Sequence, residues 1–180
     1  MLRLILIFLF FLSNANADNR EKIIERLKKT SNINFKFEQN ISGKIENGNC
    51  VIKYPKKIFC RYEKSNSKIL VSNGKSLVIK TTSSYYRYPI EKTPLNFILD
   101  KNFLINKIYS LEERIIDDSY ISYSIIENEN KTEVFFDVIS LELIGWQTKD
   151  MYQNTALTIL SSISKNQTIK KKLFKLPVQN

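Results

Sequence analysis

Cys50 and Cys60 are the only two cysteines of this 180-residue chain, which contains no histidine. Two cysteines could bind a metal, provide a catalytic thiol, or form a structural disulfide. Nucleophilic catalysis and most zinc sites rely on histidine, whose ordinary pKa of about 6.5 suits it to proton transfer and metal binding near neutrality. The nine-residue gap between the cysteines also does not match the paired ligands of a zinc finger. We therefore expect no metal site and no cofactor.

Paired carboxylates are the other candidates for chemistry. Glu112-Glu113 and Asp117-Asp118 could in principle supply the two acids of a glycosidase. Adjacent residues on a strand point to opposite faces, so solvated charges in turns are the better interpretation. The chain has only four glycines and no glycine-rich phosphate loop. We expect a protein that is not an enzyme.

The strands predicted around the two cysteines suggest that they form a structural disulfide. A turn at Pro55-Lys56-Lys57 leaves both cysteines equally far from its centre and on one face of a strand pair. Opposed residues of antiparallel strands have Cα atoms about 4.5 to 5.5 Å apart, within reach of a disulfide. Such a bridge would stabilise the fold by roughly 2 to 3 kcal/mol. The alternative is two free thiols packed as small apolar groups, if the turn misaligns the pair.

The amino terminus has the pattern of a cleaved signal peptide, residues 1–17. Arg3 precedes the apolar run 4–12, and Ala15 and Ala17 have the spacing of a signal-peptidase site. A membrane anchor is the weaker interpretation, because nine helical residues rise only ~14 Å whereas the apolar core of a bilayer measures ~30 Å. Cleavage would leave Asp18 first, and without a cysteine there we expect an exported, soluble and unlipidated protein.

The chain is strongly basic, with 28 lysines and arginines against 18 acidic residues. Removal of residues 1–17 takes away only Arg3, so 27 basic residues remain and the mature net charge is +9. A basic surface suits nucleic acid, anionic lipid headgroups or an acidic partner. For an exported protein, we expect no nucleic-acid partner.

Hydrophobic periodicity predicts one mostly antiparallel β domain over residues 18–180. A short amphipathic helix is expected at 19–30, followed by a half-buried strand from Ile33 to Ile41. Residues 83–108 break the alternation, which predicts a loop and then a short helix starting near Thr93-Pro94. Further strand segments are expected at 50–54, 58–62, 69–71, 77–79, 121–125, 134–138, 141–143 and 156–160, with turns near 128–130 and around Gly145 or Asp150.

Several short motifs occur in an order that resembles the LolA family of periplasmic lipoprotein carriers. The strand ending in Phe37-x-Gln39 is followed by Gly43 and by a strand-turn-strand with Pro55. Then come the hairpin Val71-Ser72-Asn73-Gly74-Lys75-x-Leu77, the segment Lys92-Thr93-Pro94-Leu95, which resembles the start of a lid helix, and the late segment 143–150. Together these motifs extend over nearly the whole mature chain.

The resemblance implies a mostly β (α+β) fold: one strongly curved, unclosed antiparallel sheet of about eleven strands, with an N-terminal helix and a helical lid over an apolar cavity. It implies a periplasmic monomer that accepts acylated lipoproteins from an ATP-driven inner-membrane ABC transporter and delivers them to a LolB-like outer-membrane acceptor. There are two alternatives. One is a relative that carries free lipid or another apolar ligand, and the other is a protein-interaction domain of the same fold.

Under this interpretation the inward apolar residues are candidates to bind acyl chains. They are Phe35, Phe37, Ile52, Tyr54, Ile58, Leu77, Ile79, Leu95, Ile98 and Leu99. An ordinary filled core is the alternative. Many family members have an arginine before the hairpin proline that fastens the lid, where this chain has Tyr54. Tyrosine offers one hydrogen-bond donor and arginine five, so we expect a weaker latch, with Arg87 as a possible substitute.

Overall fold

The computed structural model describes residues 19–63, 66–127, 130–149 and 153–179. The predicted signal peptide 1–17, Asp18, and the predicted turn positions 128–129 and Asp150 lie outside these residues. No helix in the described part is both long enough and apolar enough to cross a membrane.

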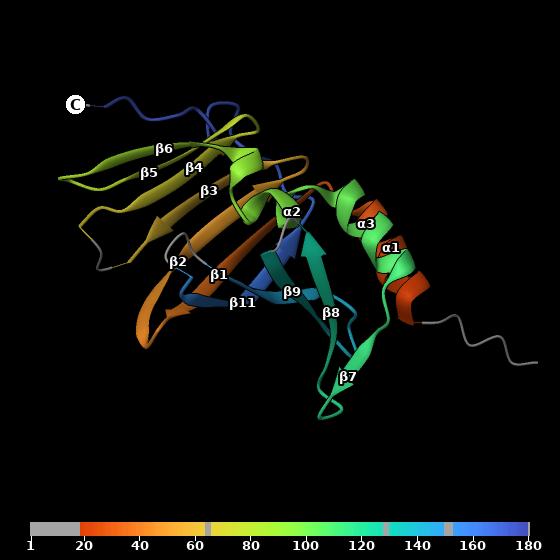
Figure 1. Cartoon of the computed structure of the whole chain (residues 1–180). Coiled ribbons are helices and arrows are strands. Elements are labelled where there is room, and N and C mark those ends of the chain that lie inside the picture. Colours follow the sequence, from red (N-terminus) through yellow and green to blue (C-terminus); the bar gives the residue numbers. More distant parts are fainter. Residues whose placement is uncertain (1–18, 64–65, 128–129, 150–152, 180) are drawn as a thin grey trace, which may run out of the picture.

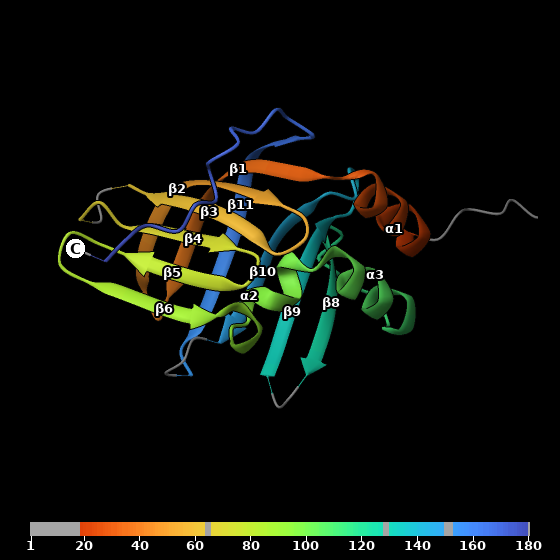
Figure 2. The ribbon, with the colours of Figure 1, turned by 90° about the horizontal axis from the view of Figure 1, so that it is seen from above.

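One antiparallel sheet of eleven strands makes up most of the structure, as the resemblance to the LolA family implied. Its strand order is β6-β5-β4-β3-β2-β1-β11-β10-β9-β8-β7, so that β6 and β7 form its two open edges. The sheet is strongly curved, with the helices gathered on and beside its concave side (Figures 1 and 2). The strands are β1 (Asn32–Ile41), β2 (Lys44–Lys53), β3 (Lys57–Tyr62), β4 (Ile69–Asn73), β5 (Ser76–Lys80), β6 (Tyr85–Pro89), β7 (Arg114–Ile116), β8 (Tyr120–Glu127), β9 (Asn130–Asp137), β10 (Leu143–Lys149) and β11 (Thr155–Lys165).

The central strand β1 shows why the sheet has one apolar face. Ile33, Phe35 and Phe37 alternate along it and are buried, whereas Lys36 and Glu38 point to the opposite face and are exposed. β1 pairs with β2 on one side and with β11 on the other, which joins the two halves of the sheet. Because a strand has a period of two, the whole apolar set of β1 lies on the concave face.

Four helical segments accompany the sheet: α1 (Asn19–Lys29), the 3-10 turn η1 (Ile90–Lys92), α2 (Leu95–Leu99) and α3 (Lys101–Ser110). α1 buries Ile23, Ile24 and Leu27, the face that its sequence predicted. α2 ends at Leu99, and the next residue, Asp100, caps the start of α3, because its carboxylate accepts a hydrogen bond from the Phe103 N–H at 3.1 Å. A carboxylate at this position satisfies a free N–H of the first helical turn.

The cysteines form the predicted disulfide across the β2–β3 hairpin. Cys50 pairs directly with Cys60 in the antiparallel register, and their Cα atoms are 4.1 Å apart. Ile52 pairs with Ile58 in the same register and lies on the same buried face. The turn at Pro55 therefore has the length that aligns the two cysteines.

The segment 83–108 differs from the prediction. Its first part is the edge strand β6 rather than a loop, and the single predicted helix is instead η1, α2 and α3. The tyrosine-rich run 85–88 favours a strand, and Pro89 is tolerated because it ends a strand at the edge of the sheet. The short edge strand β7 was likewise not predicted, because its three residues are too few to show a period.

Gly145 was predicted near a turn and instead lies within β10. A side-chain Cβ built at this glycine would lie 2.6 Å from the carbonyl oxygen of Thr158 and 3.2 Å from Cδ1 of Ile159, both on the neighbouring β11. Glycine in a strand often marks such a close approach, which the sequence alone did not distinguish from a turn.

Candidate ligand-binding interior and lid

The residues predicted to face a cavity lie together on the concave side of the sheet. Of the ten predicted residues, nine are apolar, and Tyr54 contributes its ring. All ten belong to one core cluster or pack against it, and this cluster includes the lid residues Ile98 and Leu99. Ile52, Ile98 and Leu99 are fully buried. Ile79 and Leu95 are only partly buried and pack at the margin of the cluster. In this structure the lid and the sheet therefore pack directly on one another.

The lid helix α2 is fastened to the sheet at the β2–β3 turn. The backbone N–H of Lys56 donates a hydrogen bond of 2.7 Å to the carbonyl of Leu99, the last residue of α2. The Lys56 ammonium lies 3.3 Å from the carboxylate of Asp100, and both side chains are about one third exposed or less. The Lys56 carbonyl in turn accepts a bond from the hydroxyl of Ser72. Lys56 thus links the lid to the β2–β3 turn and to β4.

Tyr54 and Arg87, the two predicted latch residues, make other contacts in this structure. The Tyr54 hydroxyl is buried without a hydrogen-bond partner among the described residues, and its burial raises the pKa of the phenol. Arg87 donates from its guanidinium to the hydroxyl of Ser76 on the neighbouring strand. Sequence reasoning missed the latch contacts of Lys56, because a bond from its backbone to residue 99 leaves no pattern in the local sequence. The aspartate before α3 could have been found as a helix cap.

The interior is apolar at the lid and becomes polar towards the β1–β2 turn. There the inward residues of β1 and β2 are Gln39 and Glu46, which pair in the register, and Gln39 donates a hydrogen bond of 3.0 Å to Thr158. The Glu46 carboxylate lies 2.5 Å from the ammonium of Lys68, which itself lies 4.0 Å from the centroid of the Tyr62 ring. An ordered charge pair therefore borders the aromatic end of the core.

The charges of this polar end are mutually stabilised. Burial favours the neutral acid at Glu46 and is the largest single influence, but the hydrogen bonds and positive charges of Lys68 and Lys44 outweigh it and hold the carboxyl pKa below its usual value. Burial also raises the pKa of the Tyr62 phenol, and the negative charge of Glu46 raises it further. The site is thus built around an ionised carboxylate.

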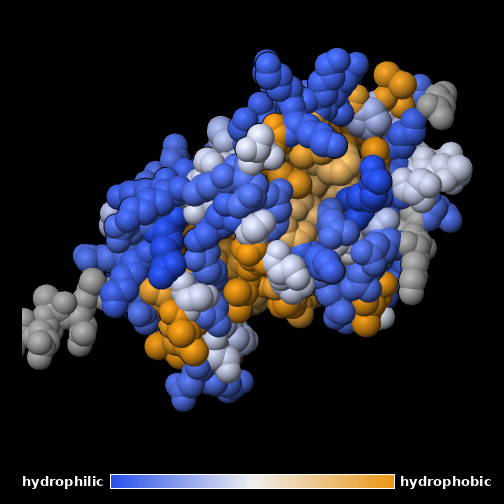
Figure 3. All heavy atoms as spheres, turned by 180° about the vertical axis from the view of Figure 1, so that it is seen from behind, coloured by the Kyte–Doolittle hydropathy of each residue, from blue (hydrophilic) through white to orange (hydrophobic). Residues whose placement is uncertain are grey.

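Apolar surface also occurs outside the core. The rear face of the molecule is mostly hydrophilic and carries an apolar hollow near its centre (Figure 3). A shallow pocket of about 340 Å³ lies on β7 to β11 and is lined mainly by apolar side chains of the face opposite the core, with Arg114 and Glu133 among them. It contains none of the ten predicted interior residues.

These features define a half-barrel protein with a helical lid over an apolar interior. A family model described as outer membrane lipoprotein carrier protein LolA matches residues 28–177, and the chain belongs to this family. The match covers the strands, the disulfide hairpin and the lid, and it confirms the family that the motifs of the sequence resembled.

Two solved structures with TM-scores above 0.5 share the fold at very low sequence identity. An uncharacterized conserved protein from Thermus thermophilus is 8% identical, with a TM-score of 0.52 over 87% of this chain and 93% of that chain. The MucA/MucB complex structure from Pseudomonas aeruginosa is also 8% identical, with a TM-score of 0.51 over 89% of this chain and 62% of that chain. A LolA superfamily protein from Nitrosomonas europaea is 11% identical, with a TM-score of 0.42 over 87% and 97%. No curated protein matches the sequence significantly.

Proposed function

We propose that the protein is a periplasmic carrier that encloses the acyl chains of lipoproteins between its curved sheet and its lid. The observation that carries the proposal is the single apolar cluster shared by the concave face and α2, in a chain that belongs to the LolA family. Apolar side chains on both surfaces can bury acyl chains without directional contacts, once the lid has moved.

The physical need for such a carrier is large. Each acyl methylene that leaves water contributes about 0.8 kcal/mol, so a lipid-modified polypeptide does not cross an aqueous space unaided at a useful rate. The carrier must also release its cargo. The lid can compete with cargo for the interior if it packs there as well as cargo does. In this structure Ile98 and Leu99 of the lid occupy the interior.

The remaining parts of the proposal follow the family. The cargo would come from an inner-membrane ABC transporter and pass to a LolB-like outer-membrane acceptor, and the protein itself would catalyse no reaction. A cleaved signal peptide would export it to the periplasm, where the Cys50–Cys60 disulfide that the structure contains would be stable.

The experiment is mass spectrometry of the full-length protein purified from its exporting cell under conditions that keep bound lipid. Acylated polypeptide in the purified complex is the expected result, whereas free lipid alone would identify a lipid carrier of the same fold, and an empty protein would contradict both. Leu95→Gln on the lid should lower the recovered cargo. The matched change Ile126→Gln, at a residue that is 69% exposed on β8, should leave it unchanged.

A further inference from the structure

The carboxyl-terminal segment 166–179 forms a strap across the outer face of the sheet. It is anchored first at β1, where the side-chain amide of Asn32 donates to the carbonyl of Gln167 and its oxygen accepts from the Gln167 N–H, both at 3.0 Å. It is anchored again at the far strands, where Lys80 donates to the carbonyl of Val178 at 2.8 Å and Tyr85 to that of Pro177 at 3.3 Å. Figures 1 and 2 show this strap lying over β3 to β5 on the side opposite the lid.

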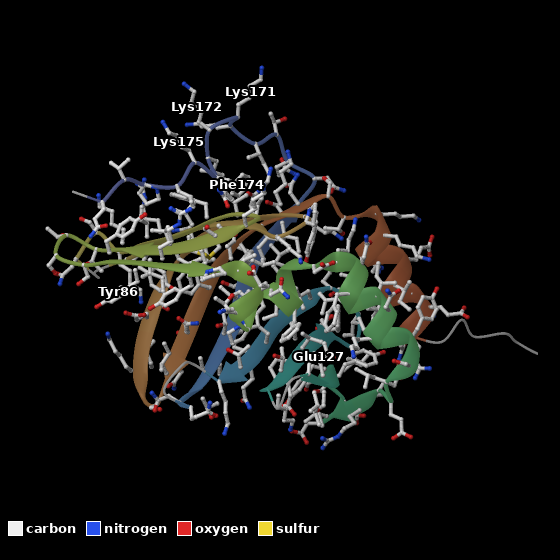
Figure 4. The ribbon with its side chains drawn as sticks, turned by 45° about the horizontal axis from the view of Figure 1, so that its top comes forward. Tyr86, Glu127, Lys171, Lys172, Phe174 and Lys175 are labelled. Atoms are coloured by element: carbon white, nitrogen blue, oxygen red, sulfur yellow. A yellow bond between two sulfur atoms is a disulfide. The ribbon has the colours of Figure 1, made fainter. Side chains whose placement is uncertain are left out.

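The strap has an apolar underside. Val71 and Val78 alternate with the core residues Leu70 and Leu77, so they point away from the core, yet they are only 1% and 0% exposed. Leu173 and Phe174 of the strap are half-buried, and Phe174 lies against the sheet in Figure 4. The strap is therefore held as a part of the fold.

The upper side of the strap is strongly basic. Lys170, Lys171, Lys172 and Lys175 fall within six residues and are exposed, and backbone bonds from Leu173 to Lys170 and from Lys175 to Lys172 hold them in consecutive turns. Figure 4 shows Lys171, Lys172 and Lys175 at the top of the view, pointing away from the sheet into solvent. Among the residues that the structure describes, none forms an ion pair with these four lysines.

The sheet beneath the strap extends this charge. Strand alternation places six basic side chains on the outer side of β1 to β6, and the acidic side chains on or beside that side are Glu38 and Glu63. Together with the four lysines of the strap they form the basic face. The six are Lys36, Lys53, Lys57, Arg61, Lys80 and Arg87.

We propose that the basic face, led by the four strap lysines, docks the protein on a membrane surface rich in anionic phospholipid. Clusters of four to eight basic residues bind such surfaces by adding many small attractions. The strap relies on lysine, a compact point charge, rather than on arginine, whose planar fork recognises individual carboxylates of a protein partner. The docking side lies opposite the lid, so a docked protein keeps its interior accessible. The proposal holds whether or not the interior carries lipoproteins.

The test is co-sedimentation of the full-length mature protein with vesicles of phosphatidylcholine alone or mixed with phosphatidylglycerol. Binding is expected only to the anionic vesicles, and it should weaken as salt shortens the Debye length from about 10 Å at 0.1 M to 3 Å at 1 M. Changing the four strap lysines to Gln should weaken binding more than about tenfold. The matched control changes Lys22, Lys28, Lys92 and Lys149 to Gln, which alters the net charge equally outside the basic face.

Two further measurements make each outcome decisive. Unchanged thermal unfolding and unchanged uptake of an apolar dye by the strap variant would show that its fold and interior are intact. Equal weakening by the control variant would mean that net charge alone drives binding, and it would overturn the proposal. Absence of binding to anionic vesicles would overturn it too; slowed cargo transfer by the strap variant in that case would indicate an acidic protein partner instead.

Discussion

Glu46 is a buried carboxylate whose ionised form is stabilised by two lysines. Its side chain is only 5% exposed, and it contacts Lys68 at 2.5 Å and Lys44 at 3.3 Å. Removing one member of such a pair leaves the other charge without its partner, which costs more than the pair itself contributes. The polar end of the interior therefore depends on a single carboxylate.

We predict that Glu46→Gln lowers the free energy of unfolding by about 2 kcal/mol near pH 7. The carboxyl pKa is lower in the folded protein than in the unfolded chain. The contribution of Glu46 is therefore complete above the unfolded pKa, and it is lost as the pH falls through the folded pKa. Denaturant unfolding of both proteins between pH 7 and about pH 3 should show the difference shrinking below about pH 4.5, which lies near the ordinary glutamate value.

The control for this prediction is Glu91→Gln, at an exposed glutamate with no ion pair in the described part of the chain. It should change stability little at any pH. If the free energies of unfolding of Glu46→Gln and the original protein instead differ by the same amount at every pH, Glu46 contributes through packing and not through charge.

The two cysteines show what sequence can predict at the level of single residues. Their pairing followed from strand parity and equal distance from Pro55, and the observed register has Cys50 opposite Cys60. The charge pair at Glu46 had no such signal, because Lys68 lies beyond the β2–β3 hairpin. Local alternation predicts which face a residue occupies, but not which distant side chain meets it there.

Under the proposed function, α2 is the element whose position would control ligand entry. It has only five residues, too few to be stable as a helix by itself, so its packing on the core and its links to the β2–β3 turn hold it. The link has two parts, the backbone bond from Lys56 to Leu99 and the ion pair from Lys56 to Asp100. The second part can be removed by substitution without changing the backbone.

We predict that Lys56→Met and Asp100→Asn each accelerate the uptake of an apolar dye several-fold while lowering stability by at most about 1 kcal/mol. Asparagine can still cap α3, so Asp100→Asn isolates the ion pair, whereas Asp100→Ala should cost about 1 kcal/mol more because the cap is lost. Stopped-flow dye fluorescence and denaturant unfolding measure the two effects. Lys75→Met, in an exposed turn, is the matched control and should take up dye at the original rate. If Lys56→Met and Asp100→Asn also take up dye as slowly as the original protein, the ion pair is not a lid latch.

Element boundaries were predictable where the apolar period was long. The helix at the amino terminus and strands β1, β3 to β5, β8, β9 and β11 follow their alternation. The predicted strand 141–143 was wrong, because β10 runs from Leu143 to Lys149, and β2 begins at Lys44 rather than at residue 50. The region 83–108 was not predictable in detail, because β6 owes its strand conformation to pairing with β5 and the division of α2 from α3 depends on the Asp100 cap. Tertiary contacts decide short elements that intrinsic preferences leave open.

At the scale of the whole molecule, the sheet and the lid are held by different forces. Each strand of the sheet is joined to its neighbours by backbone hydrogen bonds, with β1 paired along its length to both β2 and β11. The lid is held mainly by apolar packing, with few bonds to the sheet. Opening of the lid should therefore leave the sheet intact, because local openings occur where backbone links are few.

We predict that binding of a long-chain fatty acid accelerates hydrogen exchange in α2 and leaves exchange in β1 and β11 unchanged or slower. A ligand in the interior must displace Ile98 and Leu99, which are fully buried in the structure, while the hydrogen bonds of the central strands do not depend on those contacts. Exchange followed by mass spectrometry, with and without ligand, measures both regions in one experiment. Slower exchange in α2 would mean that the ligand binds beneath a closed lid, and faster exchange throughout the sheet would mean that it unfolds the protein; either result would contradict an interior that opens by movement of the lid alone.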